Sequence, residues 1–274
     1  MQEQTQAHKL SMRALDILLK RFPELRERTD ASGVYELMLD SEGKPCGKVR
    51  LFEGERIARL VYICIDHTMV ARHVPGNPLG RVDSHMIFAF TPANSAVPHF
   101  TLDSIFSHVP PMPEPVLAYH LDMIPRVDLG AHLAYMDRVY GGEVNDAYAK
   151  TRATPGFVTP SLTPRQLALM SPWMLAHRAT PEAFAQIPLE IYLERFCDLV
   201  ETGIPSSCVT AHAREGLAER DSLNRSILFN PEVDPVWSQV ERVIGAETGV
   251  RLRALLREQG GSRVSAEKHA DHRA

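Results

Sequence analysis

The spacing of hydrophobic residues predicts one helix at the start of the chain and a long run of strands after it. An amphipathic pattern at helical spacing covers residues 8 to 22, and Pro23 ends it. Between Val34 and about Val127, short segments of strand character alternate with stretches rich in Pro, Gly and Asn. These six segments are VYELMLD, KVRLFEG, RIARLVYICID, SHMIFAFTP, HFTLDSIFSHV and VLAYHLDMI. Parallel neighbours would need a long crossover segment between them, usually a helix, and none occurs here. The six segments therefore predict an antiparallel sheet.

After Asp128 the pattern becomes helical. Helices are predicted at roughly 130 to 140, 163 to 177, 181 to 202, 207 to 228 and 233 to 258. A capping residue followed by proline begins three of them, at Thr163, Thr180 and Asp234. We therefore expect an α+β fold in which helices flank a central antiparallel sheet on both faces, as in an α/β/α sandwich. Residues 1–259 are predicted to form a single domain, and 260–274 a disordered polar tail.

Composition and charge exclude several classes of protein. Hydrophobic residues make up 44% of the chain and charged residues 23%, which is typical of a folded globular protein. The net charge of -4 gives no broad attraction for nucleic acid, so we expect no nucleic-acid partner. Since no apolar run reaches the length of a membrane span and the first residues lack a secretory signal, we expect a cytoplasmic protein that does not enter a membrane.

Neither metal nor dinucleotide motifs are present. The four cysteines, Cys46, Cys64, Cys197 and Cys208, are scattered without a C-x-x-C pair, so we expect free thiols and no metal site. No glycine-rich motif for a dinucleotide or a phosphate occurs. If the chain is a redox enzyme, we expect no tightly bound cofactor of its own and electrons supplied by another protein.

Ionisable residues interrupt three apolar strands between Ser84 and Arg126. His85, Asp103, His120 and Asp122 lie in these strands, and His120 and Asp122, two residues apart, must share a face. Ionisable groups in an apolar setting require compensation. One interpretation is that each is simply well hydrogen-bonded. The other is that an acid and a histidine with shifted pKa values deliver protons in an apolar cleft.

The same strands resemble those of a known family. HMIFAFTP, which begins at His85, and PHFTLDSI, which supplies Pro98, Phe100 and Asp103, resemble the central strands of ferredoxin-dependent bilin reductases. The LDMIPRVDL segment is more similar to red chlorophyll catabolite reductases, the related branch. The chain departs from the first branch at Thr101 and Leu102, and at His99, where an apolar residue is common.

The resemblance implies reduction of an open-chain tetrapyrrole with electrons from reduced ferredoxin. It implies Asp103 as the central proton donor and His85 as its partner across the pocket floor. Asp221 is a further catalytic candidate, although it is also placed to pair with Arg225 as a charge on a helix surface. The candidate substrate-binding residues are Phe88, Phe100, His120, Asp122, Arg126, Trp173 and Arg225.

Further expectations concern the ligand and the partner. Arg72, Arg126 and Arg225 are candidates to hold the two propionates of a bilin. An acidic ferredoxin would require a local basic patch, for which KRFPELRER and RLRALLRE are candidates. The chain is expected to be a monomer or a homodimer. Two alternatives remain open: a tetrapyrrole carrier without catalysis, and a protein of the same architecture that reduces a different substrate or has an unrelated function.

Overall fold

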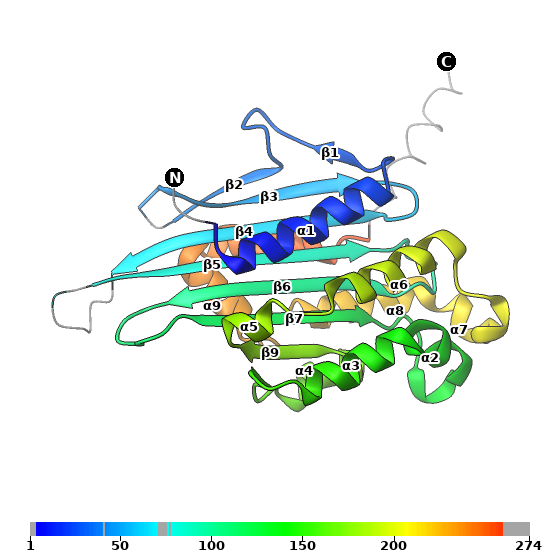
Figure 1. Ribbon diagram of the computed structural model, residues 1–274. Helices are drawn as coiled ribbons and strands as arrows, with labels where there is room; N and C mark the ends of the chain where they lie inside the picture. Colours follow the sequence, from blue (N-terminus) through cyan, green and yellow to red (C-terminus); the bar gives the residue numbers. More distant parts are fainter. Residues whose placement is uncertain (1–3, 41, 71–75, 77, 260–274) are drawn as a thin grey trace, which may run out of the picture.

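One large antiparallel sheet runs through the computed structural model, which describes residues 4–40, 42–70, 76 and 78–259 (Figure 1). Nine strands occur in these ranges, in the order β1-β3-β4-β5-β6-β7-β9-β8, and β2 pairs with β3 beside β1. The strands are β1 (Arg26–Arg28), β2 (Glu36–Leu39), β3 (Pro45–Glu53), β4 (Arg59–Val70), β5 (Leu79–Phe90), β6 (His99–His108), β7 (Val116–Ile124), β8 (Phe157–Val158) and β9 (Leu175–Ala179). The six predicted strands are β2 to β7, joined to their neighbours in chain order, and their antiparallel pairing is confirmed.

Helices cover both faces of this sheet (Figure 1). One layer contains α1 (Gln6–Arg21), α2 (Leu133–Tyr140), α3 (Glu143–Ala153), α5 (Pro181–Phe184) and α6 (Leu189–Thr202), which build the larger hydrophobic core. The opposite face packs against a second core formed with the end of α8 (Leu217–Leu228), with α9 (Val236–Ile244) and with α10 (Ala246–Arg257). The predicted sheet flanked by helices is thus confirmed, with most helices in the C-terminal half.

Several predicted helices have different bounds. The predicted helix 163–177 is wrong: α4 covers only Pro164–Leu167, and the chain then enters β9, which pairs with β7. Pro172 favours this early end, because proline disrupts a helix interior. The predicted helix 181–202 is two helices, α5 and α6, on either side of Pro188. The predicted helix 207–228 is a 3₁₀ turn (Ser206–Cys208), α7 (Ala211–Glu215) and α8.

A glycine divides the last predicted helix. The pattern at 233–258 forms α9 and α10, and Gly245 lies between them with a φ of +82°, a conformation that favours glycine. The caps at Thr163 and Thr180 are confirmed, since each side chain accepts a backbone hydrogen bond from the first turn that follows. Helix α3 and the strands β1, β8 and β9 were not predicted. Among the described residues, no helix combines the length and the hydrophobicity that crossing a bilayer demands.

Candidate functional site

A cavity of about 220 Å³ lies between the sheet and the C-terminal helices. Its floor is the face of β5, β6 and β7 that packs toward α8 and α9, and the segment from Pro160 to Met174 forms a side wall. The lining is largely apolar. The Phe229 ring meets the Phe88 ring edge to face with centroids 5.3 Å apart, and it meets the Trp237 ring in the same way at 5.6 Å. The lining includes Met86, Phe88, Thr101, Asp103, Ile105, Ala118, His120, Ile124, Pro160, Leu162, Gln166, Met170, Met174, Ala176, Arg178, Leu228, Phe229, Asp234, Val236 and Trp237.

Asp103 and His120 lie side by side on the floor of this cavity. They are directly paired positions on β6 and β7, and Asp103 Oδ2 lies 3.9 Å from His120 Nδ1. Among the described residues, Asp103 Oδ1 and His120 Nε2 are buried without a hydrogen-bond partner. The side chain of Asp103 is 30% accessible and that of His120 is 17% accessible. Both side chains therefore border the cavity, and each has one buried polar atom without a hydrogen-bond partner among the described residues.

The surroundings of the pair favour the uncharged form of both groups. Burial, together with the negative charge of Asp234, raises the pKa of Asp103 to about 8. Burial lowers the pKa of His120 to about 4. Near neutral pH the pair therefore consists of a protonated carboxyl group and a neutral imidazole, which is the protonation state that an acid catalyst requires.

Asp234 belongs to the cavity wall that faces the floor. Its Oδ1 accepts the backbone N–H of Val236 at 3.1 Å and the side-chain amide of Gln166 at 3.2 Å. Burial raises the pKa of this carboxyl group as well. The Gln166 contact joins the short helix α4 to the start of α9, so it holds the side wall in place.

Asp122 supports the cavity from beneath the same wall. Its carboxylate accepts the Ser171 hydroxyl at 2.5 Å, the Ser171 backbone N–H at 2.9 Å and the Met123 backbone N–H at 2.8 Å. Burial nevertheless raises the pKa of Asp122 to about 7. The side chain is fully buried and fixes the turn between Met170 and Met174 rather than lining the cavity. The prediction that His120 and Asp122 share a face of the sheet is confirmed.

Three predicted site residues lie on the opposite face of the sheet. His85 pairs with Ser104 and points under α1, whereas Asp103 pairs with Met86, so the two side chains point to opposite faces. The expected partnership of His85 and Asp103 across one pocket floor is therefore not what the structure has. Phe100 is buried against Phe196 with ring centroids 5.5 Å apart, in the core of the α1 and α6 layer.

Trp173 lies on the same side as Phe100 and makes its own contacts there. Its ring stacks on Tyr140 at 4.6 Å, and its Nε1–H donates to Asn145 at 3.0 Å. Neither Trp173 nor Phe100 lines the cavity, so their predicted contacts with a substrate stay predictions. His120 occupies the position beside Asp103 that sequence reasoning gave to His85.

Asp221, Arg126 and Arg225 form a buried ionic network away from the cavity. His99 Nδ1 accepts the backbone N–H of Thr91, and its Nε2–H donates to Asp221 Oδ1 at 2.6 Å. Arg225 donates to the same carboxylate at 3.1 Å, and Arg126 approaches it at 3.6 Å. The predicted pairing of Asp221 with Arg225 is thus present, but the pair is buried and not on a helix surface.

This network fastens α8 to the sheet. Arg126 also donates to Thr91 Oγ1 and to the carbonyl of Ala93, and Arg225 lies 4.0 Å above the Phe90 ring. Burial raises the pKa of a carboxyl group, but the His99 hydrogen bond and the two guanidinium groups outweigh burial and lower the pKa of Asp221. Arg126 donates to these partners, whereas Arg225 Nη2 is buried without a hydrogen-bond partner among the described residues; neither arginine lines the cavity. Arg72 lies outside the described residues, as does the predicted tail 260–274.

Sequence reasoning missed most of the cavity wall. Ile105 shares the strand face of Asp103, as the spacing of two predicts, and Thr101 could have been found by the same spacing. The sequence predicts Asp234 only as a helix start, and its place opposite Asp103 depends on how α9 packs on the sheet. Of the ten candidate site residues that the structure describes, Phe88, Asp103 and His120 line the cavity.

Comparison with solved structures finds the same architecture in tomato phytochromobilin synthase in complex with biliverdin. The two structures superimpose with a TM-score of 0.65 at 16% sequence identity, over 93% of this chain and 84% of the other. This chain has the fold of phytochromobilin synthase. No protein-family model and no curated protein matches the sequence. At this identity the comparison shows the fold, and the residues of the cavity must carry the functional argument.

Proposed function

We propose that the chain is a ferredoxin-dependent reductase of an open-chain tetrapyrrole, bound in the cavity between the sheet and the C-terminal helices. The observation that carries the proposal is the Asp103–His120 pair, uncharged at neutral pH on the floor of an aromatic and methionine-lined cavity. The shared fold supports it, because the tomato protein was solved with a linear tetrapyrrole, biliverdin.

The residues have distinct roles in this proposal. An electron from reduced ferredoxin makes the bound tetrapyrrole more basic, and protonated Asp103 then donates its proton to the ligand. Neutral His120 accepts a hydrogen bond from a pyrrole N–H or from the Asp103 hydroxyl and so orients the acid. Reduction of one double bond consumes two electrons and two protons, so the site must be reprotonated between steps. The apolar walls hold the flat rings.

The two segments expected to form a basic patch for ferredoxin are largely neutralised by ion pairs. Arginines of the two segments expected to form a basic patch are ion-paired: Arg21 with Glu201, Arg28 with Glu53, Arg251 with Glu36 and Arg253 with Glu241. A ferredoxin contact therefore needs positive charge from another part of the surface. Exposed Arg178 at the edge of the cavity is a candidate.

The decisive experiment mixes the full-length chain with biliverdin and then supplies reduced ferredoxin under anaerobic conditions. We expect a shifted bilin absorption band on binding and new product bands after electron supply. Asp103→Asn should bind biliverdin but lose at least about 100-fold in reduction rate, the usual contribution of a positioned acid. Asp137→Asn changes an exposed aspartate on α2 and should keep the wild-type rate.

The outcomes separate the alternatives. Binding without turnover by the wild-type chain favours a tetrapyrrole carrier. No spectral shift with biliverdin or with a chlorophyll catabolite favours a different substrate. Wild-type turnover in Asp103→Asn removes the carboxyl group from the mechanism.

A further inference from the structure

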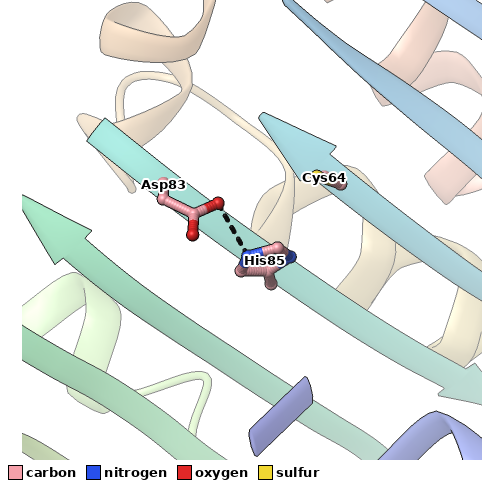
Figure 2. A group of neighbouring side chains, drawn as sticks. All are labelled: Cys64, Asp83 and His85. Carbon is pink, nitrogen blue, oxygen red and sulfur yellow. Dashed lines mark ion pairs between the residues drawn. The ribbon is translucent and has the colours of Figure 1, made fainter. Parts of the chain in front are cut away.

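A second cluster of reactive side chains lies on the face of the sheet opposite the cavity. Cys64 on β4 and His85 on β5 are directly paired positions, and Asp83 precedes His85 by two residues on the same face. Figure 2 shows the Asp83 carboxylate directed at the His85 ring, with Cys64 on the neighbouring strand. The strand register thus brings a thiol, an imidazole and a carboxylate together.

The spacing of these groups is close to that of a metal centre. One ligand atom from each side chain lies within 4.8 Å of the other two. Ligand atoms around a tetrahedral zinc ion are roughly 3.3 to 3.8 Å apart, given bond lengths of about 2.0 to 2.3 Å. Closing the cluster around an ion therefore requires movements of roughly 1 Å, which are within the reach of side-chain rotation.

His85 supplies a nitrogen with no aligned hydrogen-bond partner. The side chain is fully buried, and its Nε2 lies 2.8 Å from Asp83 Oδ1 without a hydrogen bond of acceptable direction to any described residue. A buried polar atom in this position calls for an explanation. A bound cation would satisfy both the nitrogen and the carboxylate.

Two of the three side chains also have the outer partners that are typical of metal ligands. His85 Nδ1 is 2.8 Å from the Tyr62 hydroxyl, and Asp83 Oδ2 accepts the Thr5 hydroxyl at 2.6 Å. A ligating histidine usually has its second ring nitrogen hydrogen-bonded, which fixes the orientation of the ring. These outer partners leave Nε2 and Oδ1 without other hydrogen bonds, 2.8 Å apart.

His8 on α1 lies beside the three side chains but outside the group whose atoms are within 4.8 Å of one another, so its side chain must rotate toward them to become a fourth ligand. The ring of His8 lies with its centroid 5.0 Å from that of His85, in an edge-to-face arrangement. His8 and Cys64 are both partly exposed, so an ion can reach the cluster between α1 and β4. Thr5, which contacts Asp83, is the N-cap of the same helix.

We propose that Cys64, Asp83 and His85 bind a Zn²⁺ ion, with His8 as the fourth ligand, and that the ion fastens α1 to the sheet. Thiolate, imidazole and carboxylate are the donors that zinc takes in proteins, and the thiolate disfavours Mg²⁺ and Ca²⁺. The site is separate from the tetrapyrrole cavity, so the proposal does not depend on the proposed function. It also departs from the sequence-based expectation of no metal.

Cobalt and zinc titrations of the full-length, chelator-treated chain test this proposal. Added Co²⁺ should produce a thiolate-to-cobalt absorption band in the near ultraviolet, and Zn²⁺ should displace it at one equivalent. Bound Zn²⁺ should also raise the melting temperature, because a ligand that binds only the folded chain stabilises it.

Matched variants identify the ligands. Cys64→Ser should lose the cobalt band and weaken zinc binding by at least about tenfold, the lower range for disturbing a metal site. Cys208→Ser replaces the other partly exposed cysteine and should behave as wild type. A full-length variant with His269→Ala and His272→Ala controls for binding by the C-terminal histidines and should keep the band. His8→Gln, at a partly exposed position, should weaken zinc binding without unfolding the chain.

Two results would overturn the proposal. One is wild-type protein that binds no Zn²⁺ at tenfold excess. The other is a folded Cys64→Ser variant with wild-type zinc affinity. In either case the cluster is a buried ion pair that anchors α1 through protein contacts alone.

Discussion

Asp103 and His120 face each other because two antiparallel strands put them in register, and the local environment then decides their charge. Neither side chain has a described partner that would stabilise its ionised form fully, and the charge that acts on the pKa of Asp103 is that of another carboxylate, Asp234. A protein that needed only stability would place apolar side chains here. The retained carboxyl group is therefore better explained by chemistry at the site.

The raised pKa of Asp103 predicts a measurable effect on stability. Between the ordinary carboxyl pKa of 3.8 and about 8, the folded chain holds a proton that the unfolded chain has released. Since the folded state binds more protons, this group makes the free energy of unfolding fall as pH rises through that window. Asp103→Asn removes the effect and should stabilise the protein at pH 7.

We expect Asp103→Asn to raise the free energy of unfolding at pH 7 by about 1 to 2 kcal/mol. This is well below the full value of the pKa shift, because the Asp103 side chain keeps access to the cavity. Urea unfolding of the variant and of wild type from pH 5 to 9 measures it, and the difference should grow with pH up to about 8. Asp137→Asn should show no such trend. A variant less stable than wild type at pH 7 would mean that Asp103 has a structural role.

At the scale of elements, the cavity depends on a short connection that replaces the predicted helix at 163–177. The chain from α4 to β9 is held at two points, by Gln166 on Asp234 and by Ser171 on Asp122. The cavity of about 220 Å³ is smaller than the roughly 300 to 1,000 Å³ that drug-sized ligands usually occupy. On the proposed function, a bound tetrapyrrole must therefore displace this wall outward.

Loosening the wall should strengthen ligand binding. Gln166→Ala removes one hydrogen bond, worth about 1 kcal/mol, that closes the cavity in the free protein. Biliverdin affinity, measured by absorption titration, should rise about fivefold. Gln186→Ala, an exposed residue after α5, should leave affinity unchanged. Weaker binding in Gln166→Ala would show that the amide contacts the ligand directly.

Over the whole molecule, the two helical layers are attached to one sheet by different kinds of contact. The layer with α1 and α6 packs through a large apolar core, whereas α8 is also fastened by the buried network of His99, Arg126, Asp221 and Arg225. Because α8 and α9 form the upper wall of the cavity, this network sets the distance between the wall and the floor.

Removing the charge at the centre of the network should destabilise the fold. Asp221→Asn leaves the buried guanidinium groups of Arg126 and Arg225 without their carboxylate, and should lower the free energy of unfolding by about 3 to 5 kcal/mol. Urea unfolding at pH 7 checks this value. Asp198→Asn, which disturbs an exposed pair with Arg21, should cost less than about 1 kcal/mol. A stable Asp221→Asn variant that no longer reduces bilin would instead give Asp221 a catalytic role.

The sequence by itself determined the six strands β2 to β7 of the sheet and the side-chain alternation along them. The period of two predicted β2 to β7, the shared face of His120 and Asp122, and the orientation of Ile105 with Asp103. These properties are local, since they follow from backbone geometry and hydrophobic spacing within a few residues.

Only the tertiary structure decided which polar residues meet. His85 and Met86 are adjacent on β5, so their side chains point to opposite faces of the sheet, and His85 lies under α1. On the other face, the pairing of β6 with β7 places Asp103 opposite His120. In the same way, Cys64 and Asp83 are 19 positions apart, and only strand pairing makes them neighbours. The composition of a site depends on pairing between distant segments, and the pattern within any one segment does not encode its partner's register.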